Sequence, residues 1–288
     1  MIAWLLLLPS AEPVPALAQR LRPIVAEHQG TIAVGVKHLD SGECFLHEPD
    51  RVMPTASLIK FPVLIEAYLQ ADAGRITLRD ELVLRERDKV PGSGLLTLHF
   101  SEGAKFPLRD ALRLMTAVSD NTATNLVLER VSLKAVNDRM AAWGLKETRI
   151  NAQVFRGSTT SIDKDRTAKY GLGSTTAREM LTLWEILLLG DQIRPPLQAC
   201  ILGHLRANDD TAKFSRLLPP GTRLAHKDGA VTAARTDAGV IYTAGGTLIV
   251  VVLTDNNADK RWVRDNAGNV VCARVAKAAY DQYNETKK

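Results

Sequence analysis

The sequence lacks the features that mark several large classes of protein. Its longest apolar runs are far shorter than the roughly 20 residues that a membrane-spanning helix needs, so we expect no stable membrane insertion. Its 37 Lys and Arg residues are scattered, whereas a surface that binds nucleic acid usually gathers its positive charge on one element. The chain has no internal repeat and no low-complexity tract. We therefore expect a globular protein that binds no nucleic acid.

Cysteine and histidine are too few and too dispersed for a metal site. The three cysteines leave at least one unpaired, and the six histidines form no His-Glu-x-x-His pattern. No cysteine has a second Cys or His at metal-ligand spacing. We predict no metal and no cofactor. Cys44 and Cys272 could approach each other only if the two ends of the chain share a sheet.

The first nine residues, Met-Ile-Ala-Trp-Leu-Leu-Leu-Leu-Pro, have the length of a signal-peptide core. No Lys or Arg precedes the apolar run, and the cleavage position is ambiguous between Ala11 and Ala18. The alternative is an apolar N-terminal strand or helix edge. We expect residues 1–18 to be a signal segment, the protein to be exported to the periplasm or the medium, and residues 19–288 to form a single domain.

Hydrophobic periodicity predicts strands near both ends of the chain and helices between them. Two strands alone are marginal in water, so the strands from both ends are expected to share one antiparallel sheet. The expected fold is α/β, an α+β sandwich: helices flank this sheet, and a helical lobe over about residues 70–190 is inserted between the ends. Helices are expected over residues 16–27, 57–69, 108–118, 121–131, 176–189 and 263–283, and strands over 31–36, 43–46, 224–227, 237–242 and 247–253.

Ser57-Leu58-Ile59-Lys60 places a serine and a lysine three residues apart at the start of an apolar helix. Residues three apart on a helix lie on one face, so Lys60 can reach the Ser57 hydroxyl. A serine hydroxyl is a poor nucleophile until a base takes its proton, and a buried lysine with a lowered pKa can be that base. Free backbone N–H groups at the helix start can stabilise a developing oxyanion. Ser57 is therefore the candidate nucleophile and Lys60 its activating partner.

The same pattern occurs a second time, as Ser161-Ile162-Asp163-Lys164. About one chance match is expected in a chain of this length from average residue usage, so context has to separate the two. The second match lies in a polar stretch, residues 159–169, which we interpret as a loop.

Two further short motifs follow in the chain, and each also has a structural explanation. Ser119-Asp120-Asn121 stands between two expected helices, where all three residue types are favoured as helix caps. Lys227-Asp228-Gly229 follows an apolar strand, and Asp-Gly is a signal for a hairpin turn.

Together and in this order, the three motifs resemble the set found in class A β-lactamases and penicillin-binding proteins. The resemblance covers nearly the whole chain and includes residues 54–57, 114–125 and 91–96, the last similar to the cleft-edge loop of one branch of the family. It implies an α/β sandwich with an all-helical lobe. It also implies a small-molecule substrate, either a β-lactam or a peptidoglycan-like peptide, and we expect a monomer.

The resemblance implies a role for each motif residue. Ser57 attacks the carbonyl, Lys60 takes or relays its proton, and Ser119 passes a proton to the leaving nitrogen. Asn121 binds the substrate amide and Lys227 supplies positive charge to the cleft. The N–H groups of Ser57 and of the strand after Gly229 form the oxyanion hole. Independently of the resemblance, Arg235 is a further candidate substrate-binding residue, because it should lie near the same strand as Lys227.

The chain departs from the family pattern at two places. Where class A β-lactamases carry the glutamate that activates water for deacylation, this sequence has Val154, and the associated asparagine is Ser158. Asp163 and Asp165 lie further along, out of register. Asp228 replaces the usual Ser or Thr. Its carboxylate either faces the substrate's carboxylate, or turns away to cap the Gly229 turn, or pairs with Lys227 and leaves the site.

Three functions remain open at this point. The first is a β-lactamase with slow deacylation, the second a D-alanyl-D-alanine peptidase-like enzyme, and the third a non-catalytic binding module on the same fold. The intact set of Ser57, Lys60, Ser119, Asn121 and Lys227 disfavours the third.

Overall fold

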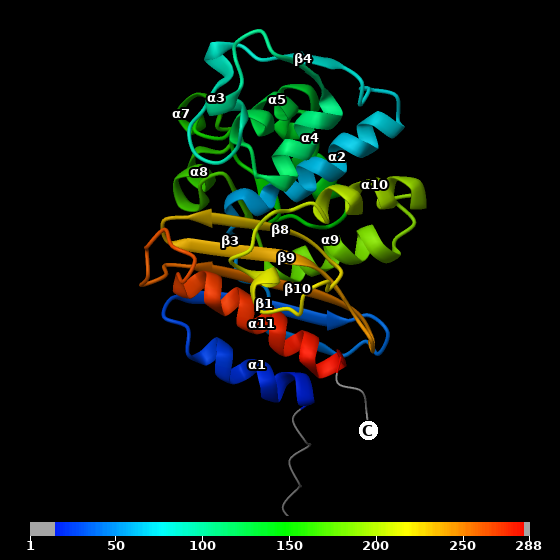
Figure 1. Cartoon of the computed structure of the whole chain (residues 1–288), viewed down its shortest axis with the longest axis vertical. Coiled ribbons are helices and arrows are strands. Elements are labelled where there is room, and N and C mark those ends of the chain that lie inside the picture. Colours follow the sequence, from blue (N-terminus) through cyan, green and yellow to red (C-terminus); the bar gives the residue numbers. More distant parts are fainter. Residues whose placement is uncertain (1–14, 285–288) are drawn as a thin grey trace, which may run out of the picture.

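A five-stranded antiparallel sheet forms the centre of the protein in a computed structural model that describes residues 15–284. The strands lie in the order β2-β1-β10-β9-β8, so both ends of the chain contribute to one sheet (Figure 1). The expected α/β fold with a sheet built from both chain ends is confirmed. The strand bounds are β1 (Thr31–His38), β2 (Cys44–His47), β8 (Leu224–Val231), β9 (Ala234–Thr243) and β10 (Gly246–Asp255).

Alternate residues of β10 face opposite sides of the sheet, and both sides are covered. Leu248, Val250 and Val252 pack against α1 (Ala16–Ala26) and α11 (Ala267–Asn284). Ile249 and Val251 join the core formed with α9 (Ala177–Leu189) and the helical lobe. Burial on both faces explains why the sequence of β10 is a continuous apolar run rather than an alternating one.

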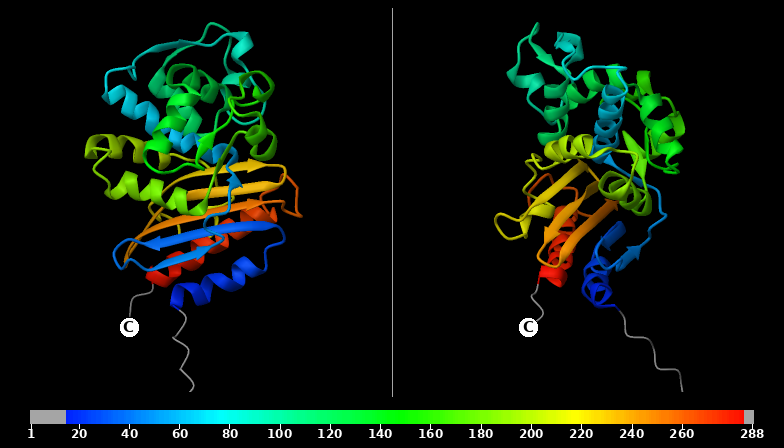
Figure 2. Two further views of the ribbon diagram at one scale, coloured as in Figure 1. Left: turned by 180° about the vertical axis from the view of Figure 1, so that it is seen from behind. Right: turned by 90° about the vertical axis from the view of Figure 1, so that its right-hand side faces the viewer.

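The helices between β3 and β8 pack into a lobe above the sheet in the view of Figure 1, and Figure 2 shows the lobe and the sheet from two further sides. Phe61 at the start of α2 stacks on Trp184 of α9 at 4.5 Å between ring centroids, which joins the lobe to the layer against the sheet. The main lobe helices are α2 (Lys60–Asp72), α4 (Leu108–Ala117), α5 (Asn121–Val131), α6 (Leu133–Ala142) and α10 (Pro195–Leu205).

Several short elements, some beside the main sheet and some at the far end of the lobe, were not predicted from the sequence (Figure 1). A small three-stranded sheet has the order β3-β7-β6, and a two-stranded one pairs β4 with β5. Pairs and triplets of residues carry too little periodicity to be read as strands. These elements are β3 (Met53–Pro54), β4 (Glu81–Val83), α3 (Leu96–His99), β5 (Lys105–Pro107), β6 (Arg149–Ile150), α7 (Gly157–Thr160), α8 (Lys164–Tyr170) and β7 (Gly173–Thr175).

The N-terminal helix α1 begins at Ala16 and so overlaps the end of the predicted signal segment, residues 1–18. Residues 1–14, which hold most of the predicted segment, lie outside the described residues. Leu17 and Ala18 belong to α1, and Leu17 is 1% exposed within the core under the sheet. Over residues 15–284, no helix combines the length and apolarity that crossing a membrane requires.

All three cysteines are free thiols, and Cys44 and Cys272 do not pair. Cys44 is exposed on β2, while Cys272 is buried in α11. The two ends of the chain do share the sheet, but they place these cysteines at different depths.

Candidate active site

Ser57 lies in a 3₁₀ turn, Ala56–Ile59, and α2 begins directly after it at Lys60. The sequence predicted one helix from Ser57 onward; the tighter turn extends that helix at its N-terminal end. Ala56 has φ +47°, a strained backbone conformation that L residues adopt rarely and that gathers at functional sites. Ser57 opens onto a cleft of about 590 Å³ between β8 and the helical lobe.

Lys60 is fully buried and points to the loop that carries Ser119. Its Nζ donates to the Ser119 carbonyl at 2.7 Å, to Asn121 Oδ1 at 2.9 Å and to Ser119 Oγ at 3.2 Å. Within the described residues, none of its hydrogen bonds goes to Ser57. Burial, reinforced by the charge of Lys227, lowers the pKa of Lys60 well below its ordinary value. A neutral Lys60 would donate one hydrogen bond fewer and gain a lone pair that can accept a proton.

The Ser-Asp-Asn motif has both a structural and a functional role. Asp120 caps α5 by accepting from Ala123 N at 2.8 Å, and it accepts from the Leu95 and Leu96 backbone as well. Ser119, with φ +54°, and Asn121 flank this cap and reach Lys60. The capping interpretation therefore holds for the central residue, while its two neighbours line the cleft.

The loop over residues 91–96 supports these two side chains from the cleft edge. Ser93 Oγ donates to the Ser119 carbonyl at 2.7 Å, and Asn121 Nδ2 donates to Pro91 O at 3.0 Å. A Cβ on Gly92, whose φ is +90°, would lie 2.6 Å from Asn121 Nδ2. Sequence reasoning noticed this loop but did not single out Ser93, because only the fold shows that its hydroxyl meets Ser119.

Gly229 brings strand β8 into contact with the nucleophile. A Cβ there would lie 2.5 Å from Thr55 O and 2.8 Å from Ser57 N, so only glycine fits without a shift. Thr236 Oγ1 on β9 donates to the same Thr55 carbonyl at 2.8 Å. The Lys-Asp-Gly motif lies inside β8, so the hairpin-turn interpretation is wrong; the turn falls two residues later, between Val231 and Ala234.

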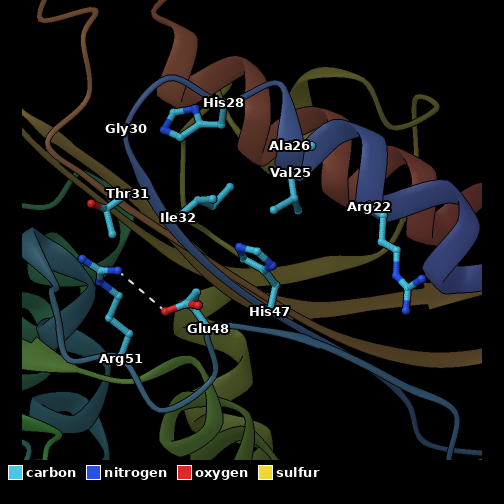
Figure 3. A pocket seen from close by; sticks show the side chains of 10 residues that line it. All are labelled: Arg22, Val25, Ala26, His28, Gly30, Thr31, Ile32, His47, Glu48 and Arg51. Carbon is cyan, nitrogen blue, oxygen red and sulfur yellow. Dashed lines mark ion pairs between the residues drawn. The ribbon is translucent and has the colours of Figure 1, made fainter.

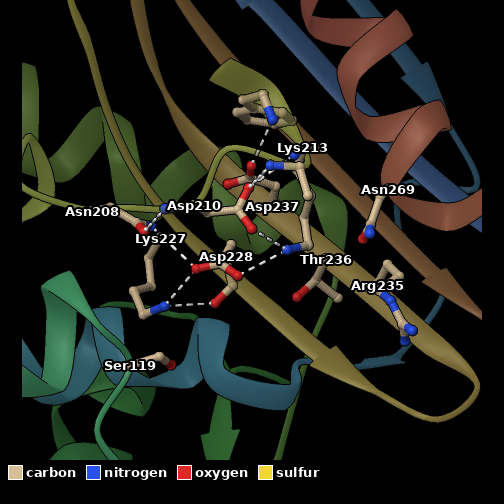
Figure 4. Close-up of polar contacts among 12 residues, drawn as sticks. Ser119, Asn208, Asp210, Lys213, Lys227, Asp228, Arg235, Thr236, Asp237 and Asn269 are labelled. Carbon is tan, nitrogen blue, oxygen red and sulfur yellow. Dashed lines mark hydrogen bonds and ion pairs between the residues drawn. The ribbon is translucent and has the colours of Figure 1, made fainter. Parts of the chain in front are cut away.

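Asp228 is held by two lysines while still lining the cleft (Figure 4). Lys227 Nζ donates to its carbonyl at 2.8 Å and to Oδ1 at 2.9 Å. Lys213 Nζ donates to Oδ2 at 2.9 Å and also binds Asp210 at 2.7 Å. Burial raises the pKa of Asp228, but the two lysines outweigh it and hold the pKa well below the ordinary value. Asp228 therefore pairs with Lys227, as one alternative supposed, but it stays in the cleft lining and does not leave the site.

Arg235 lies apart from this cluster and outside the cleft lining (Figure 4). Its guanidinium donates to the carbonyls of Val231, Ala234 at 2.9 Å and Arg261 at 3.1 Å. The ring of Trp262 covers it at 4.7 Å, and Arg235 is 2% exposed. Trp262, by contrast, is 66% exposed and lines the cleft.

Val154 faces the cleft at the position where the family pattern has its glutamate. Asp163 caps α8 by accepting from Arg166 N at 2.9 Å, Asp165 is exposed, and neither lines the cleft. The Ser161 hydroxyl, just after α7, forms a hydrogen bond with the Thr167 hydroxyl on α8. The polar stretch there is therefore not all loop: the Asp163 cap lets α8 begin at Lys164.

A second hollow of about 560 Å³ lies between α1 and β2, away from these residues (Figure 3). Arg22, His28, His47 and Arg51 line it together with Glu48, which pairs with Arg51 at 3.6 Å. It contains no serine and no lysine. Within residues 15–284, no three His, Cys, Asp or Glu side chains are placed to hold a metal ion.

The chain resembles known proteins over almost its whole length. A family model described as the beta-lactamase enzyme family matches residues 16–283. Extended-spectrum beta-lactamase PER-1 from Pseudomonas aeruginosa is 25% identical over 279 residues, which cover 92% of this chain and 87% of that protein. The crystal structure of a beta-lactamase from Sphaerobacter thermophilus is 29% identical, with a TM-score of 0.81 over 95% of this chain and 98% of the other.

Another similar structure is that of a protein called PBP-A. It is 26% identical, with a TM-score of 0.81 over 97% of this chain and all of that chain. A leucine-to-glutamate variant of PBP-A, 24% identical to this chain, has been solved as an acyl-enzyme with penicillin G, with a TM-score of 0.79 over 94% of this chain and 97% of the other.

Proposed function

The chain belongs to the beta-lactamase enzyme family and is a serine hydrolase of that type, and on this premise we propose that it works through a slowly released acyl-enzyme on Ser57. The observation that carries the proposal is the composition of the cleft. It brings Ser57 together with Ser119 and Asn121, which both bond Lys60. Among the described residues that line it, the one carboxylate is Asp228, which is paired with two lysines.

In the proposed acylation, Ser57, Lys60 and Ser119 each move one proton. Ser57 Oγ bonds to the substrate carbonyl carbon, and its proton passes to the neutral amine of Lys60. The carbon–nitrogen bond breaks, and the leaving nitrogen takes a proton from Ser119 Oγ, which lies 3.2 Å from Lys60 Nζ and recovers one from it. The N–H groups of Ser57 and of the β8 edge beside Gly229 stabilise the oxyanion, with Asn121 binding the substrate amide.

Deacylation needs a base that activates water, and Val154 offers none. A carboxylate ion-paired on both oxygens, as in Asp228, is a weak base because its pKa is low. The acyl-enzyme is therefore expected to persist for minutes or longer.

Val154 in place of a basic carboxylate also favours a second candidate, a D-alanyl-D-alanine peptidase-like enzyme. A peptidase passes its acyl group on to an acceptor amine or to water and needs no fast base for β-lactam hydrolysis. A non-catalytic module is disfavoured, because a buried lysine with a strongly lowered pKa beside a strained serine turn is arranged for chemistry.

The test is to mix the protein with penicillin G, digest it and locate the adduct by mass spectrometry. We expect a long-lived adduct on Ser57 that is absent from Ser57→Ala and unchanged in Ser161→Ala. An adduct on Ser161, or labelling that survives Ser57→Ala, would overturn the proposal. Turnover of a D-Ala-D-Ala peptide, measured beside that of penicillin G, separates the two candidate activities.

We further propose that the protein is exported as a monomer after removal of a signal segment that lies within residues 1–18, and that the remaining chain forms one domain. The place of Leu17 in the core of α1 favours processing closer to Ala11 than to Ala18, since removal of Leu17 would open the packing under the sheet. Mass spectrometry of the N-terminus of the exported protein measures this directly.

A further inference from the structure

The walls of the cleft carry almost no charge. Of the described residues that line it, Asp228 alone is charged, and no lysine or arginine is among them. The Asp228 side chain is 15% exposed, whereas that of Lys227 is 0% and that of Lys213 is 4%. A ligand in the cleft therefore meets the carboxylate of this cluster before it meets either ammonium group.

Lys227 is not free to bind an anion. Its Nζ is occupied by the Asp228 carbonyl at 2.8 Å and by Asp228 Oδ1 at 2.9 Å. If the Lys227 amine turned toward a ligand, it would break both hydrogen bonds, and the Asp228 carboxylate would be paired with Lys213 alone. Breaking a buried ion pair is costly, since it leaves an uncompensated charge.

Asp228 is fixed in this position from behind. Lys213 joins it to Asp210, and Asn208 Nδ2 donates to its Oδ1 at 3.2 Å. The carboxylate thus accepts hydrogen bonds from three side chains: Lys213 and Asn208 in the loop before β8, and Lys227 on β8, whose amine lies toward Ser119 (Figure 4). It cannot rotate out of the cleft wall without losing them.

Arg235 is unavailable for a different reason. Three backbone carbonyls accept from its guanidinium, and Trp262 lies over it. A Cβ on Gly268 of α11 would stand 2.7 Å from Arg235 Cγ, so the chain of carbon atoms behind the guanidinium is packed as well. At this place the cleft is lined by the exposed ring of Trp262, and the positive charge of Arg235 lies buried behind it.

From this arrangement we propose that the site selects acyl donors that carry no anionic group on the leaving side of the scissile bond, such as an uncharged amide, ester or esterified β-lactam. Trp262 and Val231 give this side an apolar wall in place of a cation. A carboxylate placed there would lose its hydration, face Asp228 and gain no counter-charge. The inference rests on the proposed acylation of Ser57 and adds the class of substrate.

The test compares penicillin G with its methyl ester, which differ only in that carboxylate. Acylation of the wild-type protein is followed by intact-mass spectrometry at matched concentrations. We expect the ester to acylate Ser57 about tenfold faster or more, the ratio that corresponds to about 1.4 kcal/mol. Raising the salt concentration should speed the acid more than the ester, because it screens like charges.

Two variants assign the preference to Asp228. In Asp228→Asn the ratio of ester to acid should fall to one or below, because the amide keeps the shape, loses the negative charge and leaves Lys213 and Lys227 without it. Asp228→Thr should do the same and serves if the asparagine variant does not fold. Asp50→Asn is the matched control: it removes an exposed carboxylate, paired with Arg178, that does not line the cleft, and should keep the wild-type ratio.

The outcomes separate the two proposals. Adducts on Ser57 from both compounds, with the acid reacting as fast as the ester or faster in the wild type, would overturn the substrate preference and leave the proposed function intact. If neither compound forms an adduct with the folded protein, the proposed function fails. The preference is then decided by calorimetric binding of the two compounds to Ser57→Ala, where tighter binding of the acid would overturn it.

Discussion

Replacing Val154 with glutamate should shorten the life of the acyl-enzyme. The backbone at this position is held by Asn125, whose Oδ1 accepts from Val154 N at 2.8 Å and whose Nδ2 donates to Val154 O at 3.0 Å. The side chain lines the cleft and is 8% exposed. A glutamate would therefore start from a fixed backbone and enter a cleft large enough for a carboxylate and a water molecule beside Ser57.

The size of the effect follows from what a positioned base contributes. General-base catalysis is worth typically 10²- to 10⁴-fold. We expect the lower end, about 10²-fold, because Ser158 is exposed on α7 and does not hold this loop from within the cleft. Partial burial should raise the pKa of the new carboxyl, so deacylation should increase with pH as that group ionises.

The assay is the decay of the penicillin G adduct, followed by intact-mass spectrometry after excess ligand is removed. Val154→Gln is the matched control, because glutamine has nearly the same size as glutamate but no basic carboxylate. Equal decay in Val154→Gln and Val154→Glu would show that a carboxylate at this position does not activate water, and would contradict the prediction. Rapid turnover by the wild type without a detectable adduct would show that another group already activates water.

Three further predictions concern separate parts of the molecule. Lys60→Met should lower the acylation rate by about 10²- to 10⁴-fold with the fold intact by circular dichroism, and a loss under about tenfold would mean that another residue takes the proton. Gly229→Ala should reduce acylation by about 10²-fold, since its Cβ would press on Thr55 and Ser57 N and displace β8; an unchanged rate would show that the strand gives way freely. Burial lowers the pKa of His204 to about 4, so the unfolded chain binds its proton first as the pH falls. Stability should therefore decline from about pH 6.5 to 4, by up to about 3 kcal/mol in urea titrations, and His204→Gln should flatten that decline; parallel curves for both proteins would contradict it.

Much of the site could be predicted because its residues lie close together in the sequence. Ser57 and Lys60 are three apart, and the Ser-Asp-Asn and Lys-Asp-Gly motifs are each contiguous, so residue order alone groups them. The long strands and helices were found for a similar reason, since β10 and α9 each carry a strong apolar pattern.

What escaped prediction depends on side-chain direction. Arg235 lies on β9 beside the strand of Lys227, as expected, yet its guanidinium binds three backbone carbonyls under Trp262 and does not line the cleft. Lys213 lies in an irregular stretch with no motif, and only the fold brings its Nζ to Asp228. Sequence spacing predicts which residues are neighbours along one helix or strand. The ion-pair partner of a charged side chain depends on tertiary packing, which spacing does not give.

The pairing of β1 with β10 separates in time the synthesis of two neighbouring strands. β1 pairs on one edge with β2, which follows it directly in the chain, but its other edge pairs with β10, and there Thr31 meets Asp255, roughly 220 residues later. At about 5 to 20 residues per second, that edge lacks its partner for on the order of 10 to 45 s during synthesis. An unpaired strand edge can pair with another chain, so slower synthesis should lengthen the period in which this protein is prone to aggregate.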